Sequence, residues 1–208
     1  MAWVAARPPA PSLTAAVSLF SAPLRSVPGM RGACSAGALS VAANIVRVRL
    51  FDRLREEEGA TYSPSATHSA SQVFSNWGIL YAAAEVRPDR VPVFFRVARE
   101  TVADLAARPA LADEFARAQN PVVSGIQRRL STNGYWLTAL EGFVGDPARI
   151  AEVRSYLADY RGMTAEDVRR AVAAHVADAG DWSMIVLPAR APAASAAPPA
   201  TAPRSPKK

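Results

Sequence analysis

The stretch LREEEGATYSP, Leu54 to Pro64, joins two different kinds of sequence pattern. Before it, apolar residues recur at steps of three and four, which predicts an amphipathic helix beginning near Leu39. Gly59 follows the charged end of that helix, as a glycine just past a helix end often does. The residues after the glycine are β-branched, aromatic and small polar, which indicates a strand. Arg55 and Tyr62 therefore lie seven residues apart across a predicted helix-to-strand connection.

The rest of the chain predicts an α+β fold, in which an antiparallel sheet packs against several helices. Residues 60–69 and 76–86 read as an antiparallel strand pair, and 182–188 as a buried closing strand ended by proline. Thr164 is followed three residues later by an acid, a variant of the capping box. Pro121 is expected to kink or interrupt its helix. The apolar periodicity places the helices after the strand pair at 89–107, 111–131, 134–144, 147–160 and 164–177.

Composition divides the chain into three parts. Residues 1–37 are rich in Pro, Ala, Ser and Gly without a period, which indicates a disordered or atypical leader. A cleavable signal centred on residues 12–22 is the weaker interpretation, because prolines crowd that segment. Residues 38–188 form the predicted domain. Residues 189–208 are an Ala/Pro-rich basic tail with the composition of a disordered segment.

The net charge of +6 comes from the two ends of the chain. Residues 1–37 carry +3 and residues 188–208 carry +4, so the residues between them carry about −1. A near-neutral domain offers no electrostatic footprint for a nucleic acid. No run approaches the roughly 18 consecutive apolar residues of a membrane span. We therefore expect neither a nucleic-acid partner nor a membrane span.

The residues that commonly carry catalysis or bind metal are sparse. The two histidines, His68 and His175, are far apart in sequence, and H-E-x-x-H, H-x-x-E-H and paired Cys/His spacings are absent. The single cysteine, Cys34, cannot form an internal disulfide. The run from Glu56 to Glu58 is typical of a solvated helix end. The sequence predicts no zinc site built by this chain alone.

With its following serine, the opening stretch resembles a signature of the C-terminal, non-zinc domain of the insulinase/pitrilysin family of zinc metallopeptidases. In that signature a helix ends in Leu-Arg-Glu, and then glycine and tyrosine lead into a strand. LADEFARAQNP (111–121) and STNGYWLTAL (131–140) resemble later segments of the same half, the second as it occurs in the bacterial branch. The resemblance covers roughly residues 38–188. The family's domain starts with strands before the helix, and the leader does not look like them. We therefore expect either a sheet that lacks its first strands or a contribution from residues 1–37 that their sequence pattern does not reveal.

The resemblance implies half of an enzyme, inactive alone. In this family the zinc and the catalytic glutamate belong to an N-terminal half bearing H-x-x-E-H, and the C-terminal half closes a peptide chamber. Carried over, Tyr62 would have a catalytic role in trans by donating a hydrogen bond to the oxyanion. Arg55, together with Tyr62, would bind the substrate. No cofactor is expected in this chain; the implied partners are the zinc-bearing half and a peptide substrate.

Other interpretations stay open. Arg55 can instead pair with Glu58 or the helix carboxyl terminus, and Tyr62 can be a buried strand aromatic. The chain as a whole can be a peptide-binding or scaffold module that keeps the fold without a proteolytic role, holding an extended peptide at a strand edge. Nucleic-acid binding through the tails is a third interpretation. The sequence fixes neither substrate preference nor oligomeric state, and it is compatible with a periplasmic or a cytoplasmic location.

Overall fold

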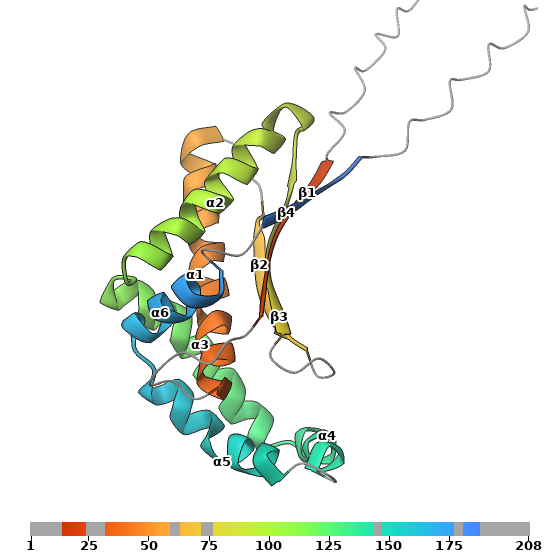
Figure 1. Cartoon of the computed structure of the whole chain (residues 1–208), viewed down its shortest axis with the longest axis vertical. Helices are drawn as coiled ribbons and strands as arrows, with labels where there is room; N and C mark the ends of the chain where they lie inside the picture. The colour runs from red at the N-terminus through yellow and green to blue at the C-terminus, as the bar shows by residue number, and fades with distance from the viewer. Residues whose placement is uncertain are drawn as a thin grey trace, which may run out of the picture.

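The structure is a computed structural model, and it describes residues 14–23, 32–58, 63–71, 77–143, 147–176 and 181–187. One strand precedes the first helix, two strands follow it, and a series of helices leads to a last strand (Figure 1). The strands are β1 (Thr14–Pro23), β2 (Ser65–Ala70), β3 (Trp77–Val86) and β4 (Asp181–Val186). The α-helices are α1 (Gly32–Glu58), α2 (Val91–Ala107), α3 (Ala112–Leu130), α4 (Asn133–Phe143), α5 (Pro147–Gly162) and α6 (Ala165–His175), and a short 3-10 turn, η1 (Pro88–Arg90), precedes α2.

The four strands form one antiparallel sheet in the order β2-β3-β1-β4. β1 therefore lies inside the sheet, between strands that come from distant parts of the chain. Thr14 pairs with Val86 at one end of the β1–β3 register, and Pro23 pairs with Trp77 at the other. β2 and β4 are the two edges of the described sheet.

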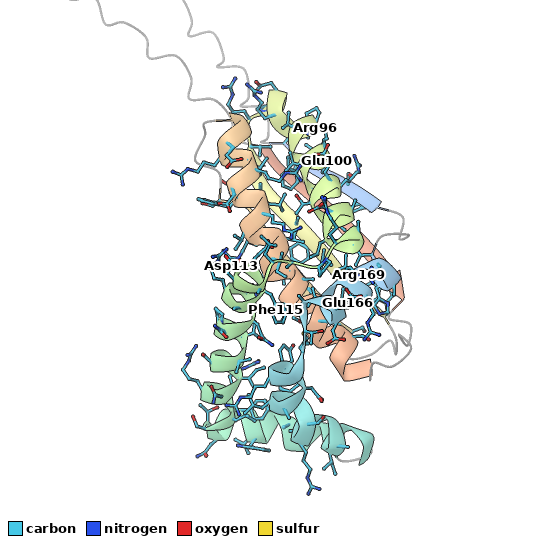
Figure 2. The ribbon with its side chains drawn as sticks, turned by 90° about the vertical axis from the view of Figure 1, so that its left-hand side faces the viewer. Arg96, Glu100, Asp113, Phe115, Glu166 and Arg169 are labelled. Carbon is cyan, nitrogen blue, oxygen red and sulfur yellow. The ribbon has the colours of Figure 1, made fainter. Side chains whose placement is uncertain are left out.

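The described helices cover one face of the sheet and leave the other face without a helix (Figure 1). Along β3 the buried positions alternate with more exposed ones, so one set of side chains faces the helices and the other faces away. The view onto the helical layer shows the helices in front of the sheet (Figure 2). The core between the layers is made by side chains of α1, α2, α6 and β3, among them Val41, Ile45, Leu50, Leu80, Phe94, Leu105, Val168 and Val172.

The structure confirms the predicted α+β arrangement and most of its elements. The strand pair is present as β2 and β3, and the helices of the second half lie close to their predicted bounds. The capping box at the start of α6 forms, with the Thr164 hydroxyl accepting from the Asp167 backbone N–H and the Asp167 carboxylate accepting from the Thr164 N–H. α3 continues through Pro121 as one helix, so of the two expected effects, a kink or an interruption, the interruption does not occur.

Two predictions about the strands are wrong. Residues 14–23 were expected to belong to a leader of little order, but they form β1, so the sheet does have a strand before its first long helix. The physical reason is that β1 is specified by its partners on both sides, and both are far away in sequence. The last strand was expected to be buried, but β4 is an edge whose described side chains are exposed. Residues 32–37 of the expected leader are the first residues of α1, so the expectation of little order is wrong for them as well. The other residues of the leader and the tail from 189 lie outside the described residues.

An ionic network joins the three longest helices. The guanidinium of Arg49 on α1 forms two hydrogen bonds with Glu114 of α3, with Nε–Oε1 and Nη2–Oε2 distances of 2.6 and 2.9 Å. It also donates to Asp104 of α2 at 2.9 Å. Arg49 and Glu114 are largely buried. One arginine thus fixes the positions of α2 and α3 against α1, because the N–H groups of its planar guanidinium are spaced to donate to carboxylate oxygens on both helices.

Gly37 allows α1 and the end of α5 to approach closely. A Cβ atom at this position would lie 3.0 Å from Cζ of Tyr160 and 3.3 Å from Cε of Met163. The Tyr160 ring is buried and makes an edge contact with Tyr156, so it has little room to move. The absence of a side chain at Gly37 is therefore a packing requirement.

We expect Gly37→Ala to destabilise the protein by about 1 kcal/mol and Gly37→Val by about 2–3 kcal/mol, because overpacking a filled core forces side chains out of place. Gly125→Ala is the matched control. It also replaces a helical glycine, but the nearest atom to its Cβ is the flexible end of Arg128 at 4.0 Å. That change should stabilise the protein by about 0.5–1 kcal/mol through helix propensity. Urea unfolding checks both, and equal effects at the two glycines would contradict the packing role.

Candidate functional site

The helix-to-strand connection after α1 is the candidate site. Arg55 lies in the last turn of α1, directly after the buried Leu54, and its side chain is exposed. It makes no hydrogen bond or ion pair with another described residue. A cation in this position stabilises the carboxyl end of the helix dipole. The same exposure leaves its guanidinium available to a carbonyl or carboxylate of a bound peptide.

Tyr62 lies outside the described residues, as do the three residues before it, so the structure does not test whether it approaches Arg55. The chain is described again from Ser63, which is exposed, and Pro64, which is buried. β2 begins at Ser65 and forms the edge of the sheet next to β3. The connection therefore ends at a sheet edge.

That open face of the sheet carries little charge. On β2 it presents Ser65, Thr67 and Ser69, which are exposed and alternate with the more buried positions. On β3 it presents Trp77, Ile79, Tyr81, Ala83 and Glu85. Glu85 is the one charged side chain among these strand positions. Hydroxyl groups and apolar surface of this kind suit a polypeptide better than a charged small molecule.

The sequence analysis did not select the residues of this face. Residues 77–86 do carry a pattern that predicts this face, because side chains of a strand alternate between the two faces of the sheet. The even-numbered positions of this segment hold no polar side chain, whereas the odd-numbered positions include Glu85. Periodicity alone does not tell which set of a strand faces the core when both contain apolar residues. The burial of Leu80, Ala82 and Ala84 by the helices decides it.

The two histidines belong to the helical side of the sheet. His175 on α6 is buried. The Nδ1 atom of His68 on β2 lies 3.2 Å from the hydroxyl oxygen of Ser40 on α1. Burial, and secondly the charge that His175 can carry, lower the pKa of His68 from 6.5 to about 4. His68 is therefore neutral at physiological pH and part of the packing between α1 and β2.

The depressed pKa of His68 predicts a loss of stability in mild acid. Between pH 6.5 and 4 the unfolded state binds a proton at His68 that the folded state does not bind. The free energy of unfolding should therefore fall as the pH falls through this window, by at most about 1.4 kcal/mol per pH unit. Urea unfolding at pH 7 and pH 5 measures it. His68→Gln should flatten the dependence; an unchanged slope in that variant would assign the effect to other groups.

The described residues do not fit a zinc ion. No three His, Cys, Asp or Glu side chains among them come together as a possible metal-binding group. Glu56 is exposed at the end of α1, and the side chains of the next two glutamates lie outside the described residues. None of the described helices has the length and apolar character needed to cross a bilayer.

The comparisons with known proteins give one family match and a set of structures with a similar fold. Residues 32–122 match the family model of the peptidase M16 inactive domain. The fold is that of the inactive peptidase domain of an assigned zinc protease from Bordetella parapertussis, at a TM-score of 0.68 and 17% identity. That similarity covers 90% of this chain and 97% of the other.

Two longer chains of known structure contain the same fold. The periplasmic protease PqqL from Escherichia coli is similar over 87% of this chain at a TM-score of 0.67 and 16% identity, but the match spans only 20% of PqqL. The peptidase M16 inactive domain from Pseudomonas fluorescens matches 84% of this chain and 41% of its own, at a TM-score of 0.65 and 17% identity. No curated protein sequence matches this chain. The similar structures establish the fold.

Proposed function

We propose that this chain is the non-catalytic half of an M16 zinc metallopeptidase and completes a peptide chamber with a half that carries H-x-x-E-H. The observation that carries the proposal is the M16 inactive-domain match over 32–122. The open sheet face supports it, since it offers a polypeptide a broad and nearly uncharged wall (Figure 1). In this proposal the zinc and its chemistry belong to the other half.

Within this proposal, the helix-to-strand connection supplies two groups to the substrate. The Tyr62 hydroxyl donates a hydrogen bond to the oxygen that becomes negative when water attacks the peptide carbonyl. The exposed Arg55 holds a carbonyl or carboxylate of the peptide and orients it. Both groups act on a peptide whose scissile bond lies at the zinc of the other half.

Reconstitution tests this function. The chain is mixed with an M16 half from the same genome that carries H-x-x-E-H, and cleavage of a fluorogenic peptide library is followed. We expect cleavage from the mixture, none from this chain alone, and loss of cleavage on adding a zinc chelator. A mixture as inactive as this chain alone would contradict the proposal.

The second candidate is a peptide-binding module without a proteolytic role. The two free edges of the described sheet, β2 and β4, favour it, because an extended peptide can add to such an edge through main-chain hydrogen bonds. This function predicts peptide binding that needs neither zinc nor a second half. Isothermal titration of the purified chain with peptides in the presence of chelator separates the two candidates.

A further inference from the structure

β4 is an apolar strand exposed at the edge of the sheet. It pairs with β1 on one side, and the backbone groups on its other side bond to no described residue. Its side chains and the residue after it include large apolar groups that are 38–66% exposed. They are Trp182, Met184, Ile185, Val186 and Leu187.

Both faces of β4 are exposed. The hydroxyl of Ser183 accepts a hydrogen bond from Arg99 of α2 at 3.3 Å, which places Ser183 on the helical side. Alternation along the strand puts Ile185 on the same side and Met184 on the open side. Yet Ile185 is 49% exposed, so the helical layer stops short of it. The apolar surface therefore wraps around the edge instead of lying only on the open face.

After Asp181, its first residue, the strand lacks the features that protect an exposed edge. Natural edge strands that face water usually carry a lysine or another charge, a proline, or a bulge. From Trp182 to Leu187 there is no charged residue and no proline. An edge of this composition is expected where another strand completes the sheet, because water would otherwise face both the unpaired backbone and the apolar side chains.

We infer that the β4 edge is a docking site at which the zinc-bearing half adds an extended strand to this sheet. The inference rests on the proposed function for the identity of the partner. A substrate peptide lying on the open face could not reach Ile185, whereas a folded body that contributes a strand can cover both faces of β4. The same fold occurs within longer chains, as 20% of PqqL and 41% of the Pseudomonas fluorescens protein, so it exists with further polypeptide beside it. The uncharged edge calls for an equally uncharged, apolar partner strand.

The experiment compares three versions of the full chain with the H-x-x-E-H half used for reconstitution: the wild type, Ile185→Lys and Leu137→Lys. Leu137 on α4 is 65% exposed and far along the chain from β4, so its variant is a matched apolar-to-charged control. Sedimentation measures complex formation, hydrogen exchange measures protection of the β4 amides, and peptide cleavage is recorded on the same samples. Circular dichroism confirms that each variant folds.

We expect the amides of 182–187 to exchange at least about tenfold more slowly in the complex, and Ile185→Lys to weaken the complex at least about tenfold while Leu137→Lys does not. A cleaving complex in which β4 exchanges as fast as in the free chain would overturn the docking site but leave the proposed function. A complex held through β4 that cleaves nothing would overturn the function alone. Three other results would overturn the docking site. The first is that no complex forms. The second is that the free chain is a dimer that Ile185→Lys dissociates, and the third is that a substrate peptide alone slows exchange of the β4 amides.

Discussion

Replacing Tyr62 by Phe is expected to lower kcat of the reconstituted peptidase on the order of a hundredfold or more, with little change in KM. The change removes one hydroxyl, and the proposed function assigns that hydroxyl to the oxyanion. Removing one preorganised donor of this kind typically costs 10²–10³ in turnover, because the hydrogen bond strengthens as charge develops. Steady-state kinetics on a fluorogenic peptide measures the effect.

Tyr135→Phe is the matched control, since it removes the same atom from a tyrosine on α4, away from the helix-to-strand connection. It should leave kcat and KM unchanged. Arg55→Lys keeps the charge but loses the planar fork, so it should act mainly by raising KM. Equal activity of Tyr62→Phe and the wild type would remove Tyr62 from the mechanism and leave its side chain a structural role.

Arg49→Leu is expected to destabilise the chain by about 3 kcal/mol. The change deletes the cation that binds Glu114 and Asp104, and it leaves the carboxylate of Glu114 largely buried without its partner. Breaking a buried ion pair from one side is costly for this reason, on the order of 3–5 kcal/mol. The partial exposure of these side chains places the expected value at the lower end. Urea unfolding at pH 7 measures it.

A second substitution distinguishes the charge effect from lost packing. Adding Glu114→Leu to Arg49→Leu removes the stranded carboxylate, so the double variant should recover part of the lost stability. Arg117→Leu is the surface control, because its pair with Asp113 is exposed on both sides and should contribute less than about 1 kcal/mol. A double variant that is less stable than Arg49→Leu would show that the residual Glu114 charge is not the source of the cost.

The helical layer could be predicted from the sequence because its signals are local. The period of 3.6 in 91–107 and the Thr164–Asp167 cap lie within single elements, and both appear in the structure. β1 could not be predicted in this way. Its residues stand among prolines and small residues, and its place in the sheet depends on strands 77–86 and 181–186, which lie far from it in sequence.

The last strand shows a related limit. A short apolar run indicates a strand but does not separate a buried strand from an edge. The sheet order places β4 at the edge, which reverses the expected exposure of Trp182 and Ile185. At the candidate site, the sequence motif assigned roles to Arg55 and Tyr62, and the structure adds the exposure of Arg55. The open sheet face could be recognised only from the tertiary packing.

The most direct test of the proposed half-enzyme is a titration. A fixed amount of the H-x-x-E-H half is mixed with increasing amounts of this chain, and the initial rate of peptide cleavage is measured at each ratio. The rate should rise from near zero and level off once every zinc-bearing half is paired, with the Tyr62→Phe chain giving the same midpoint and a plateau about a hundredfold lower. A cleavage rate that does not depend on the amount of this chain would contradict its role as a half of the enzyme.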